Sequence, residues 1–130
     1  MDNNRIFLVI DDDPDDRYFF SDAIKKIDPG ARCISATNGE EALIKLRNGI
    51  QQLPDLIFLD LNMPRMDGRL CLAELKKDPA LKAIPVIILS TSSSKNDIDE
   101  TAKMGAAYFI TKPTDISKLH EELSFAIRTF

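Results

Sequence analysis

The chain has 130 residues, of which 44% are hydrophobic and 29% charged, and its formal net charge is -4. These values are typical of one globular domain, and the length is too small for two ordinary domains. The basic residues alternate with acids instead of forming the cluster that nucleic-acid binding requires, so we expect no nucleic-acid partner. No stretch resembles a signal peptide or a membrane span. Cys33 and Cys71 lack metal-ligand spacing and are expected to be buried thiols, so we expect a cytoplasmic protein without a membrane partner.

Short apolar runs alternate with amphipathic segments along the chain. The first run, residues 6–10, predicts a buried strand that ends at Asp11, Asp12 and Asp13. A helix is expected to follow, with Asp13 as its N-cap and Pro14 at its first position, and residues 28–30 should stop it. Acidic residues in its first turn, Asp15 and Asp16, suit the positive end of a helix.

The same alternation continues to the end of the chain. Further strands are expected over residues 33–36, 56–59, 86–89 and 108–111, and further helices are expected to open near Asn38, Asp67, Ser94 and Thr114. Five strand–helix units with short connections predict an α/β fold with a doubly wound, five-stranded parallel sheet. This is the flavodoxin-like (βα)5 arrangement, with three layers in the order helix, sheet, helix.

Polar side chains stand at the carboxyl ends of the predicted strands, where such sheets bind their ligands. They are Asp11, Asp12, Asp60, Ser90 and Lys112. Two carboxylates about 4 Å apart repel one another by roughly 4 kcal/mol at an effective dielectric constant near 20. A divalent cation with oxygen ligands would relieve this repulsion, and Mg²⁺ or Mn²⁺ fits such ligands. Carboxylates, a metal ion, a lysine and a hydroxyl together indicate phosphoryl transfer, with one carboxylate as the nucleophile.

Residues 54–68, with the sequence PDLIFLDLNMPRMDG, resemble the phosphoacceptor segment of receiver domains from two-component response regulators. The acidic pair Asp11-Asp12, Ser90 after the fourth strand and Lys112 after the fifth match the same family in order and spacing. The resemblance covers nearly the whole chain. It implies one receiver domain over residues 1–130, with no output domain.

The resemblance also implies a role for each site residue. Asp60 would accept a phosphoryl group from a phosphohistidine. Asp12, Asp60 and the backbone carbonyl of Asn62 would bind Mg²⁺, with Asp11 acting through a bound water. Lys112 would pair with Asp60 and then with the phosphoryl oxygens. Ser90 would hydrogen-bond the phosphoryl group as the switch, with Phe109 as the aromatic whose rotamer follows it. The Lys112–Pro113 peptide bond would be cis.

The partners implied are a sensor histidine kinase or histidine phosphotransfer protein and a downstream protein that the sequence does not name. The chain would be a monomer or a phosphorylation-dependent homodimer.

Several residues also have simpler interpretations. Asp13 is expected only to cap a helix, Thr114 to cap the last helix, and His120 to lie at the surface. Phe109 could equally be an ordinary core aromatic. Asn62 and Ser92 could modulate attack of water on the phosphoaspartate.

Three other functions compete with the receiver hypothesis. A small Mg²⁺-dependent phosphatase with Asp60 as nucleophile would need a second aspartate two positions on, where this chain has Asn62. A flavodoxin-like cofactor carrier would need a first loop that accepts a phosphate, and Asp11–Asp13 would repel one. A scaffold that is never phosphorylated would be expected to lack an acidic residue of the site, and all of them are present.

Overall fold

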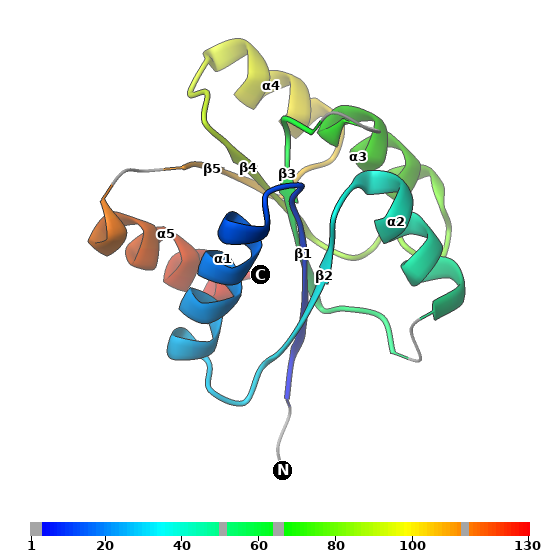
Figure 1. Cartoon of the computed structure of the whole chain (residues 1–130). Helices are drawn as coiled ribbons and strands as arrows, with labels where there is room; N and C mark the ends of the chain where they lie inside the picture. Colours follow the sequence, from blue (N-terminus) through cyan, green and yellow to red (C-terminus); the bar gives the residue numbers. More distant parts are fainter. Residues whose placement is uncertain (1–3, 50–51, 64–66, 113–114) are drawn as a thin grey trace.

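The computed structural model describes residues 4–49, 52–63, 67–112 and 115–130, which form a parallel sheet between two layers of helices (Figure 1). Strands and helices alternate throughout. In chain order the elements are β1 (Ile6–Ile10), α1 (Pro14–Ile27), β2 (Arg32–Ala36), α2 (Gly39–Ile44), the π-helical continuation η1 (Lys45–Gly49), β3 (Leu56–Asp60), α3 (Gly68–Lys77), β4 (Val86–Ser90), α4 (Lys95–Lys103), β5 (Tyr108–Thr111) and α5 (Ile116–Thr129).

The five strands are parallel and lie in the order β2-β1-β3-β4-β5. This confirms the predicted flavodoxin-like α/β fold. β1, β3 and β4 are buried along their whole length, because each has a strand on both sides and helices over both faces. β2 lies at an edge of the sheet and is more exposed, and only one of its five residues is buried.

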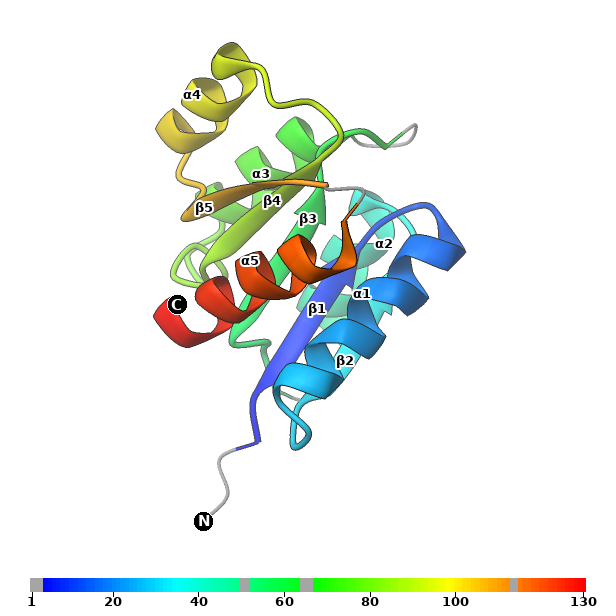
Figure 2. The ribbon, with the colours of Figure 1, turned by 90° about the vertical axis from the view of Figure 1, so that its left-hand side faces the viewer.

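Successive strand residues point to opposite faces of the sheet and so enter two separate apolar clusters. Phe7, Val9 and Phe58 pack against α1 and α5, whereas Leu8, Ile10 and Ile57 pack against α2 and α3. Figure 2 shows α1 and α5 in front of the sheet, with α2 and α3 behind it. Each helix layer therefore buries one set of alternate strand residues.

Side-chain caps fix where the helices begin. The Asp13 carboxylate accepts a hydrogen bond from the Asp15 amide at 2.9 Å, and Pro14 is the first helical residue, as predicted. Asn38, Asp67 and Ser94 cap α2, α3 and α4, at the places where these helices were expected to begin. The cap of α5 was predicted wrongly. It is Asp115, whose carboxylate accepts from the Ser117 amide at 2.9 Å, and Thr114 lies outside the described residues.

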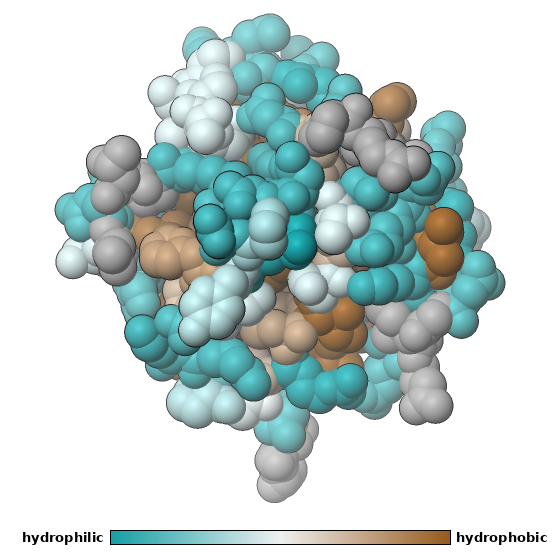
Figure 3. All heavy atoms as spheres, in the orientation of Figure 1, coloured by the Kyte–Doolittle hydropathy of each residue, from teal (hydrophilic) through white to brown (hydrophobic). Residues whose placement is uncertain are grey.

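Gly105 follows α4 with a positive φ of 106°, as expected for the residue that ends a helix. The predicted second helix changes character at Lys45, where the α-helical pattern gives way to a π-helical turn, while Leu46 remains buried. In the described part of the chain, no helix is both long enough and apolar enough to cross a membrane. Polar side chains dominate the face of the molecule seen in Figure 3, and apolar ones are scattered among them.

Candidate functional site

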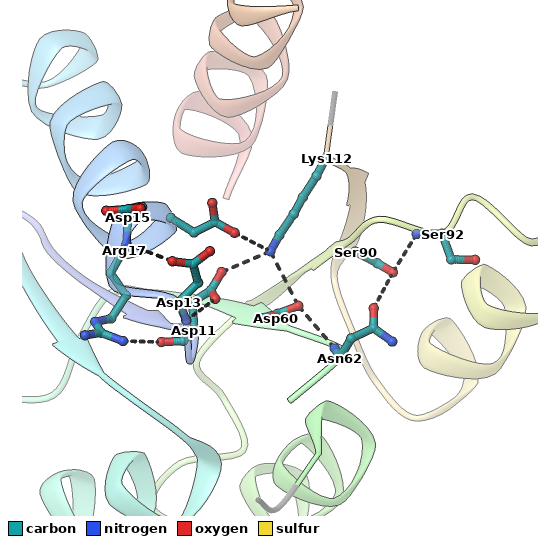
Figure 4. Close-up of polar contacts among 10 residues, drawn as sticks. Asp11, Asp13, Asp15, Arg17, Asp60, Asn62, Ser90, Ser92 and Lys112 are labelled. Atoms are coloured by element: carbon teal, nitrogen blue, oxygen red, sulfur yellow. Dashed lines mark hydrogen bonds and ion pairs between the residues drawn. The ribbon is translucent and has the colours of Figure 1, made fainter. Parts of the chain in front are cut away.

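The strand order brings the predicted site residues to one edge of the sheet. β1 and β3 are neighbours in a register that pairs Ile10 with Leu59, so Asp11 and Asp60 follow at the same level. β4 lies beside β3 and ends at Ser90, and the Lys112 amide just after β5 donates to the Ser90 carbonyl. Figure 4 shows Asp11, Asp60, Ser90 and Lys112 converging at this edge.

Three carboxylates come together as the sequence predicted. Asp11, Asp12 and Asp60 each place a carboxylate oxygen within 4.8 Å of the others. Asp11 is fully buried and Asp60 is 4% exposed, whereas Asp12 faces solvent. Two buried acids and one exposed acid, all offering hard oxygen ligands, suit a divalent metal ion that keeps part of its water shell.

The pKa of Asp60 is raised from 3.8 to about 6. Burial of its carboxyl group is the largest cause, and the charges of Asp11 and Asp12 raise it further. The Lys112 ammonium and the Asn62 amide, which donates to Asp60 Oδ1 at 3.1 Å, act in the opposite direction. Asp60 therefore carries its charge at neutral pH at a cost to the folded state.

Lys112 connects the acids of the site. Its Nζ lies 3.0 Å from Asp11 Oδ2, 3.1 Å from Asp16 Oδ2 and 3.6 Å from Asp60 Oδ1. Burial of the ammonium lowers the pKa of Lys112, but Asp60 and Asp11 outweigh it and the net pKa is raised. The predicted ion pair with Asp60 is present, although the two shorter contacts are with Asp11 and Asp16.

The Ser90 hydroxyl is buried and takes part in two hydrogen bonds. It donates to Asn62 Oδ1 at 3.1 Å and accepts from the Ser92 amide at 3.0 Å. Both residues that were expected to modulate water attack, Asn62 and Ser92, thus contact the expected switch residue. Figure 4 shows this chain of polar contacts running from Asp60 through Asn62 to Ser90 and Ser92.

Close backbone packing fixes the segment after Asp60. The Gly68 amide donates to the Leu61 carbonyl at 3.1 Å, and a Cβ at Gly68 would lie 2.5 Å from Leu61 Cα and 2.7 Å from the Asp60 carbonyl oxygen. Only glycine permits this approach of α3 to the end of β3. This packing joins the start of α3 to Leu61, which directly follows Asp60.

Phe109 and His120 lie away from the carboxylates. Phe109 is half-buried on β5 and packs against the cluster under α2 and α3. It also lines a pocket of about 240 Å³ between α4 and β5, together with Ile98, Thr101, Ala102, Ala106, Ala107 and Tyr108. His120 is partly exposed on α5. The predicted cis bond between Lys112 and Pro113 involves a residue outside the described part of the chain.

Sequence reasoning missed two contacts of the first helix. The Asp16 carboxylate reaches Lys112, and Arg17 Nη1 donates to the Asp11 carbonyl at 2.7 Å. Asp16 had been interpreted only as an acid at the positive end of a helix. No local signal in the sequence identifies this contact, because Lys112 lies 96 residues away in the chain.

Known proteins of similar sequence belong to two-component signalling. Response regulator Rcp1 from Synechocystis is 30% identical over 119 residues, which are 88% of this chain and 81% of Rcp1. Sensor histidine kinase CheAY from Helicobacter pylori is 36% identical over 108 residues. These residues are 83% of this chain but only 13% of CheAY.

Solved structures of similar fold also include response regulators. The phosphorylated cyanobacterial phytochrome response regulator RcpA superposes with a TM-score of 0.87 at 32% identity, covering 98% of this chain and 97% of that one. The Mn²⁺-bound form of Rcp1 superposes with a TM-score of 0.79 at 28% identity, covering 97% of this chain and 93% of that one. The family model of the response regulator receiver domain matches residues 7–124. The chain therefore belongs to the response regulator receiver domain family, whose members are phosphorylation-dependent signalling proteins rather than turnover enzymes.

Proposed function

We propose that Asp60 is the phosphoacceptor of this receiver domain and that its phosphorylation switches the binding of a protein partner. The observation that carries the proposal is the position of Asp60, a buried carboxylate between two other acids and Lys112 at the carboxyl edge of the sheet. The phosphodonor would be the phosphohistidine of a histidine kinase or of a histidine phosphotransfer protein.

The acidic cluster fits Mg²⁺, or Mn²⁺ in its place. Asp12, Asp60 and the backbone carbonyl of Asn62 would hold the ion, and Asp11 would contact it through water. When bound, the ion neutralises negative charge on the phosphoryl group and offsets the repulsion among the carboxylates. A relative with a similar fold, Rcp1, has been solved in a Mn²⁺-bound form, which supports a divalent ion here.

The protein groups supply the rest of the chemistry. A carboxylate oxygen of Asp60 attacks phosphorus, the bond from phosphorus to the donor imidazole nitrogen breaks, and the electron pair stays on that nitrogen. With a pKa of about 6, Asp60 is mostly ionised at neutral pH and can act as the nucleophile. The Lys112 ammonium, 3.6 Å from Asp60 Oδ1, stabilises the charge on the transferred group.

Phosphorylation would add a charge of about -1.5 to -2 and three acceptor oxygens next to Ser90. We infer that the Ser90 hydroxyl then leaves Asn62 and donates to the phosphoryl group. Its movement opens space into which Phe109 can turn, at the pocket between α4 and β5. The surface formed by α4, β5 and α5 would thereby change shape and present or hide a binding site for the downstream protein.

The organisation of the protein is also part of the proposal. We infer a cytoplasmic single-domain regulator, monomeric or dimerising on phosphorylation. The match to 81% of the length of Rcp1 supports a single domain of that kind. The match to a short part of CheAY shows that similar domains also occur inside longer proteins.

Labelling with radioactive acetyl phosphate and Mg²⁺ tests the proposal. The wild-type protein should incorporate acid-stable, base-labile label, and Asp60→Asn should incorporate none. The matched control is Asp99→Asn, which removes an exposed carboxylate on α4 and should label like wild type. Equal labelling of wild type and Asp60→Asn would refute the assignment. Continuous phosphate release from a small phosphoester would point instead to a phosphatase.

A further inference from the structure

Asp16 is a third acidic partner of Lys112 besides the two predicted site residues. Its Oδ2 lies 3.1 Å from Lys112 Nζ, within hydrogen-bond distance, whereas the nearest oxygen of Asp60 is 3.6 Å away. A lysine ammonium has three donors. Two of them are directed to Asp11 and Asp16, so the nucleophile receives the weakest contact of the three.

The three acids that contact Lys112 differ in how far they are buried. The Asp11 side chain is 1% exposed and the Asp60 side chain 6%, whereas the Asp16 side chain is 38% exposed. An ion pair open to water is screened and weak, and a buried one is costly to break. Asp11 is therefore the partner that Lys112 keeps. Asp16 is the partner that Lys112 can leave when a phosphoryl group with more negative charge forms at Asp60.

A role in beginning α1 does not explain why Asp16 lies where it does. The Asp13 carboxylate already caps α1, and Pro14 fills its first position. Asp15 and Asp16 both lie in the first turn and both gain from the positive helix end. Among the described residues, only Asp16 of these two contacts Lys112, 96 residues away in the chain.

We propose that Asp16 is a positioning residue for Lys112, which it draws toward α1 and away from Asp60 in the unphosphorylated protein. This inference rests on the proposed role of Asp60 as phosphoacceptor. During transfer the ammonium has to move toward the charge that develops at Asp60, and the contact with Asp16 opposes that movement. Asp16 thus slows phosphorylation and limits accidental activation by small phosphodonors.

The test compares Asp16→Asn with Asp15→Asn by following acetyl phosphate labelling over time. Both variants remove one negative charge from the same helical turn, so the change in net charge and in long-range repulsion of the anionic donor is matched. Asp16→Asn should raise the maximal labelling rate about fivefold over Asp15→Asn, which corresponds to about 1 kcal/mol, the upper range for an exposed ion pair. The half-saturating concentration of acetyl phosphate should stay within about twofold of the control.

Two further variants separate positioning from a structural effect. Asp16→Glu keeps a carboxylate in reach of Lys112 and should restore a rate within about twofold of wild type. In a Lys112→Ala background, Asp16→Asn should have no effect beyond that of Asp15→Asn, because the group that it positions is gone.

Equal rates in Asp16→Asn and Asp15→Asn would overturn the inference, as would a slower rate in Asp16→Asn or an effect that persists without Lys112. These outcomes leave the proposed function intact as long as labelling requires Asp60. Labelling of Asp60→Asn would refute the proposed function itself.

Discussion

Replacing Asp60 by asparagine removes a charge that the fold buries, and we expect it to stabilise the metal-free protein at neutral pH. Burial, aided by Asp11 and Asp12, raises the pKa of Asp60 from 3.8 to about 6. The folded protein therefore binds the proton of Asp60 more tightly than the unfolded chain does between about pH 4 and pH 6. The stability of the wild type falls as the pH rises through this window, and the loss is complete above it.

The size of the effect follows from the two pKa values. A difference of about two pKa units corresponds to about 3 kcal/mol at about pH 7.5 and to roughly half of that at about pH 5. Asparagine has the shape of aspartate, and Lys112 keeps its contacts with Asp11 and Asp16 when the charge of Asp60 is gone. The pKa of about 6 already includes the opposing effect of the Lys112 ion pair, so we expect Asp60→Asn to be more stable than wild type by about 3 kcal/mol at neutral pH.

Urea unfolding of wild type, Asp60→Asn and the exposed control Asp99→Asn, in chelator at the two pH values, measures this difference. Addition of Mg²⁺ at neutral pH should stabilise the wild type and leave Asp60→Asn almost unchanged, because a ligand stabilises the state that binds it. The reasoning is refuted if Asp60→Asn is less stable than wild type at neutral pH. A gain that is the same at both pH values would refute it equally.

Two predictions concern other parts of the fold. Gly68→Ala should lower the free energy of unfolding by about 1–3 kcal/mol in urea, because its Cβ would lie 2.5 Å from Leu61 Cα and the backbone would have to move. Stability equal to wild type would contradict this. Cys71 is fully buried and its pKa is raised to about 12, so iodoacetamide should modify it only after unfolding, whereas the half-buried Cys33 should react first. Reaction of Cys71 at the rate of a free thiol in the native protein would show that α3 opens.

Local signals in the sequence were sufficient for most of the fold. Continuous apolar runs marked the buried strands, and Asp13, Asn38, Asp67 and Ser94 marked helix starts because a cap depends on amides only two or three residues away. The failure at α5 has the same origin. Two neighbouring residues could both supply a capping oxygen, and the sequence does not say which of them adopts the extended backbone of an N-cap, as Asp115 does.

The site was predictable only as a set of strand ends. Parallel strands bring Asp11, Asp60, Ser90 and Lys112 to one edge whatever their side chains do. Which partner each side chain selects depends on tertiary packing. The contact between Asp16 and Lys112 requires α1 to pack beside α5 on one face of the sheet. The hydrogen bond from Ser90 to Asn62 requires the segment after β3 to lie beside the end of β4.

The strand order also determines when the site can exist during synthesis. β1 is paired on one side with β2 and on the other with β3, which begins at Leu56, about fifty residues later in the chain. Because the strands are all parallel, no tight hairpin can form early, and folding must close long loops first.

Asp11 leaves the ribosome about a hundred residues before Lys112, the cation that contacts it in the folded protein. A nascent chain that ends before β5 therefore carries the acids of the site without their lysine. With the roles proposed for Asp60 and Lys112, we expect a nascent chain to become competent for phosphorylation only after the residues that follow β5 have been synthesised.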